Sequence, residues 1–564
     1  MSDPLLSDAL PDLAVGNNAG YRRDTATVTI CTLISRVSGF GRVLAIAAVM
    51  GNGLLADVYL TANMIPNLLF ELVALGVLQA VLVPSFVAAR RDGGDAALGD
   101  AARATSGVIV AVLGLVAVVG MATAPLVARL LLLSEPSAPV ANEKLDLMVP
   151  MVLVFVPQLI SYGVVTVLSA ALHAKGRFVA ATLAPAVNNI IVIAACIAFR
   201  ASRNGRVADL DLTVWQFTLI AGGTSVAVLA FSLTPAVALR RLGVKWWPQW
   251  RPGHEAVVSM KRSFKWATVS IVGTLVPTVA ALVLGNGAAG GVAVFVYAFA
   301  FFVLPHALIA VPIATTLVPR VADGWQRGHR EAVRSAIDGA VRLAIPVLVL
   351  AAAGMVGLAW PMTRLLAGVG QTASQGLAPI AHTLVAFGPG LIGYGIAFVM
   401  IRVLFAVEDV KRSSVLMIYG AFTGVGVMAL AAHLMATDER STALAIGYGA
   451  SQTVGAVLLT RRVYVLTGSV ALKRVARVLG ESLLAGVIAW AVMVVVVRLF
   501  EPTRLDALPA FLLGGMAGVV SFTCVLAAFH RRELLDRWHG VEIGVDSGGD
   551  SGGARPVRSG DPTA

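Results

Sequence analysis

Charged residues are scarce in this chain of 564 residues. Asp, Glu, Lys and Arg together make up 13% of it, whereas soluble proteins carry about 25%. Hydrophobic residues make up 58%, and the mean hydropathy is +0.84. A chain with so little polar surface cannot cover its apolar faces in water. The composition therefore excludes a soluble protein and predicts that lipid surrounds most of the molecule.

Cysteine is also scarce, and the motifs of soluble catalysis are missing. The cysteines, Cys31, Cys196 and Cys524, lie far apart inside apolar runs, which is typical of packing residues and not of a metal site or disulfide framework. The sequence has no P-loop and no paired carboxylates or His–acid site near either membrane interface. We therefore expect no enzyme activity and no cofactor. The first 25 residues lack the basic-then-apolar order of a cleaved signal peptide.

Long apolar runs fill the rest of the sequence. A bilayer core needs about 20 apolar residues per helix. Runs of that length cover residues 26–50, 55–89, 105–133, 145–173, 179–200, 213–239, 263–284, 289–319, 335–366, 377–406, 413–435, 441–460, 474–498 and 507–530. The sequence predicts an all-α polytopic membrane protein with about 14 transmembrane helices.

The basic residues follow the membrane topology. The net charge of +12 could indicate a nucleic-acid partner, but most Lys and Arg residues fall in alternate loops and form no single patch. Loops on the cytoplasmic side carry the excess of Lys and Arg. We therefore expect a multi-pass protein of the bacterial inner membrane with both termini in the cytoplasm, and no nucleic-acid partner.

An internal duplication divides the chain into two lobes. Gly51-Asn52-Gly53 recurs as Gly285-Asn286-Gly287, and Leu82-Val83-Pro84 recurs as Leu317-Val318-Pro319, both at an offset of about 234 residues. An even number of spans per repeat makes the repeats parallel. The expected domains are a cytoplasmic arm (1–25), a first six-helix lobe (26–241), a basic linker (242–262), a second six-helix lobe (263–466), two further helices (467–532) and a disordered Gly/Ser/Asp-rich tail (533–564).

Arg36 and Arg42 are the clearest functional candidates, because both lie within the first apolar run. Each costs roughly 2.5–3.5 kcal/mol to insert, so each should face protein or a water-filled cavity. They point about 120° apart around a helix, so only a wide cavity could be lined by both. Guanidinium groups pair bidentately with phosphate oxygens, so we favour a phosphate or pyrophosphate site.

Other charged residues leave alternatives open. Arg36 could instead form an internal ion pair with Glu71 in the second run. Asp57, near the outer end of that run, could be exposed or could pair with Arg42. Arg402 lies near the inner end of the tenth run and could extend to the membrane interface.

Several segments resemble the MurJ/MviN family of lipid II flippases. The first two runs, SRVSGFGRVLAIAAVMGNGLLADVYLTANMIPNLLFELVALGVLQAVLVPSF, are similar to the opening of that family. LHAKGRFVAATLAPAVNN, LPHALIAVPIATTLVPRV and RVLFAVEDVKRS are similar to later segments of it, in the same order. The resemblance covers roughly residues 26–530.

The resemblance implies two lobes in a V around a cationic cavity, with helices 13 and 14 forming a groove for a lipid tail. It implies a flippase that moves lipid II, a polyprenyl-pyrophosphate-linked peptidoglycan precursor, to the outer leaflet by alternating access. The expected partners are this lipid, membrane lipids and cell-wall synthesis enzymes. Arg36 and Arg42 match the family's two first-span arginines, and Asp57 matches its second-span acid. The candidate substrate-binding residues are Arg36, Arg42, Asp57, Asn67, Glu71 and Arg402.

The sequence departs from the family pattern at several places, and the eleventh run has no Asn or Asp for a sodium site of the family type. Phe70-Glu71 stands where the family often has basic residues, and residues 298–304 are uncharged where it often has an arginine. An exporter of another polyprenyl-linked glycan, or of a small molecule, on the same fold is the alternative function.

Overall fold

The computed structural model describes residues 18–529, apart from 72–75, 207–208, 368–369, 373–375, 471 and 502. The expected tail and the first 17 residues of the expected arm lie outside the described residues. Residues 18–25 of that arm are helical, so the first helix begins earlier than its apolar run.

The first lobe is built from the helices before residue 242. They are α1 (Asn18–Met50), α2 (Leu54–Phe70), α3 (Gly76–Ala122), α4 (Ala124–Leu131), α5 (Ala138–Phe155), α6 (Gln158–Ala174), α7 (Val179–Ser202), α8 (Val214–Phe217), a π-helical turn (Thr218–Gly222) and α9 (Gly223–Arg241). α3 is two helices joined at a kink, because Gly93 and Gly94 leave helical geometry there and Gly94 has a φ of 66°. The runs expected at 55–89 and 105–133 are thus joined by a helical hairpin.

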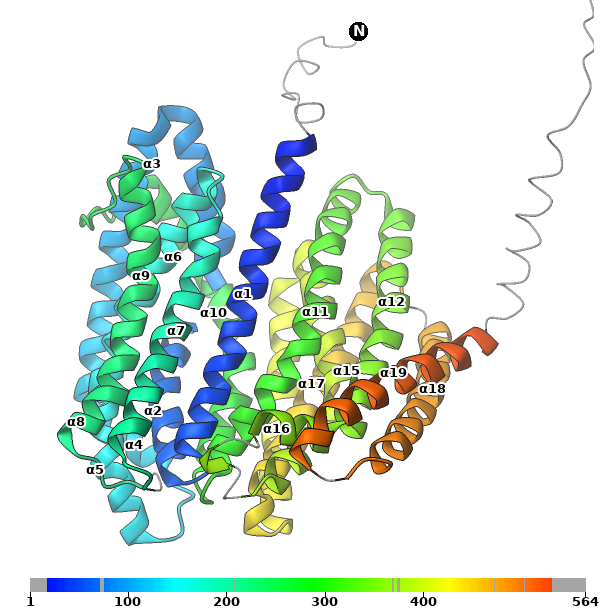
Figure 1. Cartoon of the computed structure of the whole chain (residues 1–564). Helices are drawn as coiled ribbons and strands as arrows, with labels where there is room; N and C mark the ends of the chain where they lie inside the picture. The colour runs from blue at the N-terminus through cyan, green and yellow to red at the C-terminus, as the bar shows by residue number, and fades with distance from the viewer. Residues whose placement is uncertain are drawn as a thin grey trace, which may run out of the picture.

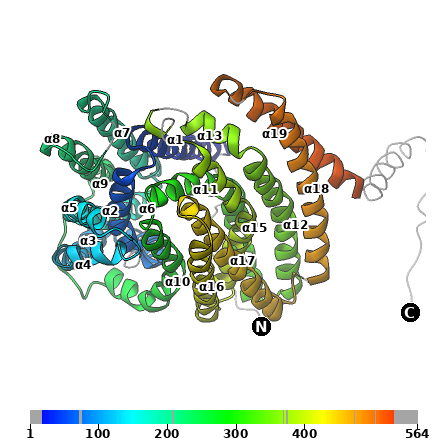
Figure 2. The same cartoon turned by 90° about the horizontal axis from the view of Figure 1, so that it is seen from below.

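The second lobe and the last two helices follow. They are α10 (Glu255–Gly285), α11 (Gly291–Gln326), α12 (Arg330–Gly357), α13 (Ala359–Ala367), α15 (Ala378–Ala406), α16 (Val410–Leu434), a 3-10 turn (Thr437–Glu439), α17 (Arg440–Thr467), α18 (Leu472–Arg498) and α19 (Arg504–Phe529). α18 and α19 pack on each other, and α18 packs against α12 on the outside of the second lobe (Figure 2).

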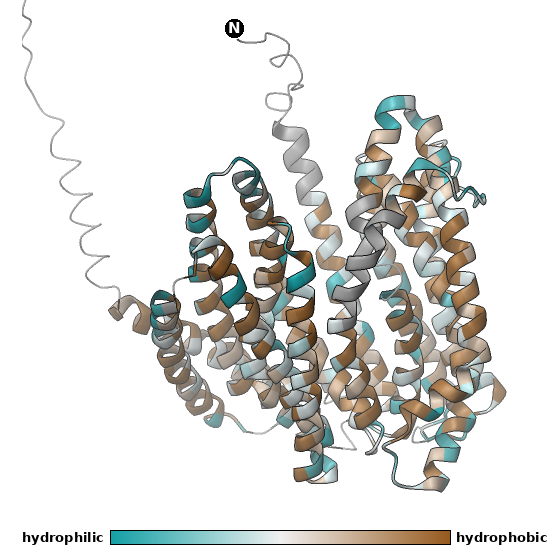
Figure 3. Cartoon of the chain, turned by 180° about the vertical axis from the view of Figure 1, so that it is seen from behind, coloured by the Kyte–Doolittle hydropathy of each residue, from teal (hydrophilic) through white to brown (hydrophobic). Residues whose placement is uncertain are grey.

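The helices account for the fourteen expected membrane passes. Twelve described stretches are long and apolar enough to span a bilayer, and two shorter apolar helices, Leu54–Phe70 and Leu275–Gly285, belong to the second and seventh passes. Hydrophobic residues cover the middle of the bundle, and hydrophilic residues gather at its two ends (Figure 3). The prediction of an all-α membrane protein with two six-helix lobes and two C-terminal helices is confirmed.

The two ends of the bundle are packed differently. We call the end where α1 begins the upper end, and the end where α1 stops the lower end (Figure 1). The largest hydrophobic core joins both lobes near the lower end, with Met50 and Leu55 of the first lobe packed in one cluster with Leu282, Val292 and others of the second. Two further cores lie toward the upper end: α3, α6 and α9 share one with Ala256 at the start of α10, and α11, α12 and α15–α19 share the other. The lobes therefore share their largest core toward the lower end, and at the upper end the start of α10 packs against α3.

The linker between the lobes lies at the upper end and packs on α3. The backbone N–H of Gln249 donates to the carbonyl of Arg103 over 3.0 Å. Gly107 permits this approach, because a Cβ there would lie 2.0 Å from the carbonyl oxygen of Gln249. Trp247 and Trp250 are 74% and 64% exposed, as expected for an interfacial segment.

Candidate functional site

Asp57 joins the two lobes at the lower end. Its Oδ2 accepts from the backbone N–H of Gly290 over 2.6 Å, and its Oδ1 accepts from that of Ala293 over 2.8 Å. These are N–H groups of the first turn of α11, which have no acceptor within their own helix and lie at the positive end of its dipole. Asp57 is completely buried. The expectation that Asp57 is exposed or pairs with Arg42 is wrong, because the first turn of α11 supplies better donors.

A buried ion pair lies beside this cap. The Nζ of Lys144 donates to Oε2 of Glu135 over 2.6 Å and to the backbone carbonyl of Asn286 over 2.9 Å. The Lys144 side chain is fully buried, and that of Glu135 is 7% exposed. The amide of Asn286 in turn donates to the hydroxyl of Thr61 over 3.1 Å. A charged pair of the first lobe is thus tied to the turn that precedes α11.

The duplicated Gly-Asn-Gly motif forms both halves of this contact. The hydroxyl of Tyr297 in the second lobe donates to the carbonyl of Gly51 over 2.8 Å. Gly290 has a φ of +78°, and a Cβ there would lie 2.0 Å from the carbonyl oxygen of Asn52. Only glycine fits there, because the backbones of the two lobes meet without room for a side chain.

The segment between α13 and α15 completes the contact. The amide of Asn52 donates to the carbonyl of Gly376 over 3.3 Å, and the hydroxyl of Thr372 donates to the carbonyl of Ala47. Six residues make these hydrogen bonds between the lobes, and we call them together the lower contact: Asp57, Lys144, Asn286, Tyr297, Asn52 and Thr372. Within the described ranges, the hydrogen bonds between the two lobes are confined to the lower end.

Arg36 lies above the lower contact and faces the second lobe. Its side chain is exposed, and it is close enough to His306 of α11 for a direct electrostatic effect on that imidazole. One helical turn below, the ring of Phe40 packs edge-on against Phe301 of α11, with centroids 5.0 Å apart. α1 therefore touches α11 at Phe40 and leaves the Arg36 guanidinium free above this contact.

His306 stands in an aromatic wall of the second lobe. Its ring centroid lies 4.1 Å from that of Tyr394 and 4.8 Å from that of Phe398, both on α15. The guanidinium of Arg402 lies 5.2 Å from the Phe398 ring centroid, a cation–π contact. The Nδ1 of His306 is buried and has no hydrogen-bond partner in the described part of the chain.

Glu71 faces the same wall from the end of α2. It is half-buried and acts electrostatically on Tyr394 and Tyr448 of the second lobe. The ion pair with Arg36 that was an alternative from the sequence is not formed among the described residues. We call Arg36, Glu71, His306, Tyr394 and Arg402 the interlobe site.

Arg42 and Asn67 lie on the first-lobe side instead. Arg42 is half-buried and acts electrostatically on Tyr59, Tyr162 and Cys196, and its Nε is buried without a partner among the described residues. Asn67 donates to the carbonyl of Asn63 in its own helix over 2.8 Å. The two arginines lie about 120° apart around α1. Arg36 therefore faces the second lobe, and Arg42 faces the first.

The family of the chain follows from a comparison with known families. Residues 46–505 match the model of the family described as "Lipid II flippase MurJ". This segment holds the lower contact and most of the interlobe site. The chain belongs to the MurJ family.

Individual MurJ relatives are distant but cover most of the chain. A protein of Rhizobium tropici named "Probable lipid II flippase MurJ" is 28% identical over 394 residues, which is 68% of this chain and 70% of the relative. "Lipid II flippase MurJ" of Burkholderia cenocepacia is 26% identical over 396 residues, which is 69% of this chain and 74% of the relative.

Solved structures show the same fold. A structure titled "Lipid II flippase MurJ, inward closed conformation" matches with a TM-score of 0.70 and 16% identity, covering 90% of this chain and 99% of that one. An inward-facing multidrug resistance transporter of the MATE family matches with a TM-score of 0.59 and 17% identity, covering 78% of this chain and 99% of that one. The MurJ fold is thus shared with a wider group of transporters.

Sequence reasoning missed two parts of this arrangement. His306 is not among the sequence candidates, although it lies in the segment LPHALIAVPIATTLVPRV that resembles the MurJ family. Lys144 was not singled out, although it is a lysine near the start of a long apolar run. A single charge beside an apolar run is the signal that could have found it.

Proposed function

We propose that this chain transfers lipid II, a polyprenyl-pyrophosphate-linked peptidoglycan precursor, from the inner to the outer leaflet of a bacterial inner membrane. The two lobes alternate between a state joined at the lower end and a state joined at the upper end. The membership of the MurJ family supports this cargo. The activity is transport, and no chemical bond of the cargo changes.

The arrangement of the interlobe hydrogen bonds carries the proposal. They join the lobes at the lower end, where the largest hydrophobic core is also shared by both lobes. A transporter that exposes its site to one side at a time needs such a contact, which forms in one state and breaks in the other. The lower contact suits this role, because its buried polar groups bond across the lobe boundary.

The interlobe site supplies chemistry for an anionic headgroup. The exposed guanidinium of Arg36 lies opposite His306, and Arg402 stands on the same wall of the second lobe. A guanidinium donates two parallel hydrogen bonds to a phosphate, and these bonds strengthen where water is partly excluded. In this proposal Arg36 and Arg402 bind the pyrophosphate. The aromatic wall, with Tyr394, packs against the sugars, and Glu71 accepts from their hydroxyls.

Arg42, Asp57 and Asn67 have other roles in the proposal. Arg42, whose Nε is buried and has no partner in the described part of the chain, binds the pyrophosphate in a later state, when the lobes have moved. Asp57 holds the lower contact closed until then, and Asn67 stabilises the wall of the first lobe near Tyr162.

The upper end is cytoplasmic in this proposal, with both termini on that side, because the basic loops lie there. The structure then faces the cytoplasm, where lipid II is loaded. Trp250 lies in the upper linker and is 64% exposed. A cysteine at this position should react with an impermeant maleimide only in opened cells. Labelling in intact cells would show that the upper end lies outside the cell and that the proposed orientation is wrong. Docking of cell-wall synthesis enzymes on the chain stays a prediction.

Reconstitution tests the function. Liposomes are prepared with headgroup-labelled lipid II in both leaflets, and an impermeant quencher is added outside. Without protein about half of the label is quenched, and with the purified chain nearly all of it should be. Labelled phosphatidylcholine should remain half protected in the same liposomes. Equal protection of lipid II with and without the chain would rule out flipping of this cargo.

A further inference from the structure

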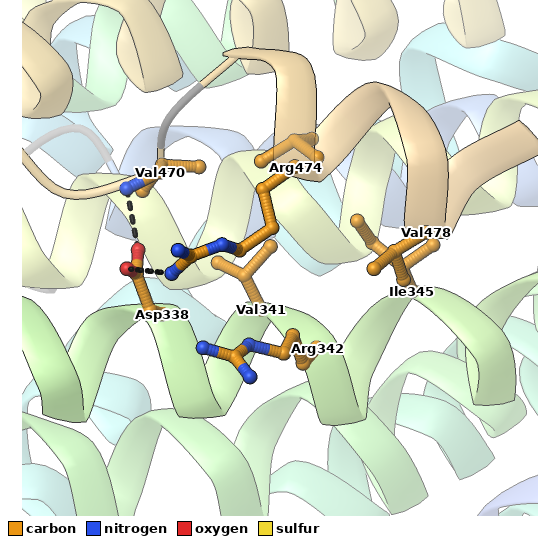
Figure 4. A pocket seen from close by; sticks show the side chains of 8 residues that line it. Asp338, Val341, Arg342, Ile345, Val470, Arg474 and Val478 are labelled. Carbon is orange, nitrogen blue, oxygen red and sulfur yellow. Dashed lines mark hydrogen bonds and ion pairs between the residues drawn. The ribbon is translucent and has the colours of Figure 1, made fainter. Parts of the chain in front are cut away.

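A pocket between α12 and α18 near the upper end has no role in the proposed transport. It is small and partly open to the surface, and it is lined by Asp338, Val341, Arg342, Ile345, Val470, Arg474, Val475 and Val478 (Figure 4). One wall belongs to the second lobe and the other to the first of the two C-terminal helices. The lining combines two guanidinium groups and a carboxylate with five branched aliphatic side chains.

The carboxylate in this pocket is already bonded. Asp338 accepts from the backbone N–H of Val470 over 2.5 Å and from Arg474 over 3.5 Å. It therefore stabilises the start of α18 and offsets one of the two arginines.

The guanidinium of Arg342 is the uncompensated charge. Its side chain is exposed and, among the described residues, it has no hydrogen-bond or ion-pair partner. Figure 4 shows Arg342 and Arg474 extending toward the same side of the pocket, on either side of Val341. The pocket therefore has a net positive charge and donors that suit an anion with several oxygen atoms.

The height of the pocket matches that of lipid headgroups. Arg342 is the last charged residue of α12 before an uninterrupted apolar stretch, and the next residue, Leu343, is 61% exposed. On α18 the basic residues of the first turns give way to Leu484 and Val487, which are 50% and 57% exposed. Exposed apolar side chains on a membrane helix face acyl chains, so the arginines lie at the boundary where lipid phosphates lie.

We propose that this pocket binds the phosphodiester headgroup of an anionic phospholipid of the upper leaflet. Arg342 and Arg474 donate hydrogen bonds to the phosphate oxygens. These oxygens thus serve as the acceptors that Arg342 does not find among the described residues. Val475 and Val478, which are half-buried, pack against the glycerol and the first acyl carbons. Because the two arginines stand on different elements, the bound lipid fastens α18 to the second lobe. Lipid binding at this pocket does not depend on which cargo the chain transports.

The matched variants are Arg342→Gln and Arg461→Gln. Each removes one exposed arginine near the upper end of a helix of the second lobe, but Arg461 does not line the pocket. Neither arginine has an ion pair in the described part of the chain, so both variants should fold. Thermal unfolding of the purified full chain is measured in detergent with added phosphatidylglycerol, phosphatidylcholine or inorganic phosphate. Bound lipids are counted by native mass spectrometry.

Phosphatidylglycerol should raise the unfolding temperature of the wild type more than phosphatidylcholine does, because a ligand that binds only the folded state stabilises it. Arg342→Gln should lose at least half of this increment and retain one fewer tightly bound phosphatidylglycerol, whereas Arg461→Gln should match the wild type. An unchanged increment and lipid count in Arg342→Gln would overturn the proposal. Full stabilisation by inorganic phosphate alone would also overturn it, because the ligand would then be a free anion.

Discussion

Asp57 of the first lobe caps α11 of the second, with its carboxylate oxygens 2.6 Å from the backbone nitrogen of Gly290 and 2.8 Å from that of Ala293. The residues are far apart in the sequence, and without this carboxylate two N–H groups at the start of α11 would lose their acceptors in a buried place. When the lobes separate at the lower end, water must take over these bonds. The strength of this cap therefore sets part of the balance between the two states.

Asp57→Asn should shift that balance toward opening of the lower end. An amide has one acceptor oxygen, so it cannot serve both N–H groups, and it loses the charge that favours the helix N-terminus. Hydrogen bonds to charged groups contribute about 1.5–3 kcal/mol, so the ratio of open to closed molecules should rise about 10- to 100-fold. The measurement is the rate at which a cysteine placed at Thr372 reacts with an impermeant maleimide from the lower side.

Asp438→Asn is the control for this change. Asp438 is also at the lower end, but it is exposed and outside the lower contact. Its variant should label at the wild-type rate. Equal rates for Asp57→Asn and Asp438→Asn would mean that the cap does not hold the lobes together.

Gly290→Ala should force the lower contact apart, because the new Cβ would lie 2.0 Å from the carbonyl oxygen of Asn52. Gly328→Ala is the matched control: Gly328 has a φ of +75° and open space around its Cβ position. Both variants bear about 1–2 kcal/mol of left-handed backbone strain. They differ only in whether the new Cβ collides with a neighbouring atom. We expect faster labelling at the lower side and impaired transport for Gly290→Ala alone. A normal phenotype in Gly290→Ala would show that the close approach is not required.

The sequence alone predicted the helices and the two lobes, and it singled out the arginines of the first run as candidates. The passes were predictable because each needs about 20 apolar residues, and the repeated Gly51-Asn52-Gly53 and Gly285-Asn286-Gly287 revealed the duplication. Arg36 was recognisable because a charge inside an apolar run is costly. These are local signals, and each can be detected within a single window of sequence.

Partners across the lobe boundary could not be predicted. Asp57 bonds backbone groups on the other lobe, and any helix N-terminus would offer the same donors to a carboxylate. Lys144 pairs with the nearby Glu135, but its second bond is to the carbonyl of Asn286. Such contacts depend on how the lobes pack, and no periodicity in one helix encodes that.

Lys144→Met should destabilise the folded chain strongly. The substitution leaves the buried carboxylate of Glu135 without its cation, and breaking such a pair from one side costs about 3–5 kcal/mol. Adding Glu135→Gln should restore much of the loss, because the remaining buried charge is then gone. The unfolding temperature in detergent is the measurement.

Lys245→Met is the control for this pair, since Lys245 is exposed in the upper linker. It should leave the unfolding temperature unchanged. If Lys144→Met behaved like Lys245→Met, the ion pair would be unimportant for stability. If the double variant were no better than Lys144→Met, the loss would come from the bond to Asn286.

Arg36→Ala should abolish transport without lowering the amount of protein in the membrane, because the side chain is exposed and has no ion pair among the described residues. Arg36→Lys should restore activity only partly, since an ammonium keeps the charge but lacks the planar fork. Arg36→Ala combined with Glu71→Ala should stay inactive.

Complementation of a flippase-depleted strain measures activity. Arg91→Ala, which removes an exposed arginine at the upper end, is the control and should remain active. Recovery of activity in the double variant would instead support a structural pair between Arg36 and Glu71.

The most direct test of the account is the amount of lipid II in the outer leaflet of cells depleted of their own lipid II flippase. An enzyme added from outside cleaves only the lipid II exposed there, and the product is quantified. Cells that produce this chain should return to the level seen before depletion, and cells that produce Arg36→Ala at the same membrane abundance should stay at the depleted level. Outer-leaflet lipid II that stayed at the depleted level with normal amounts of the wild-type chain in the membrane would contradict the account.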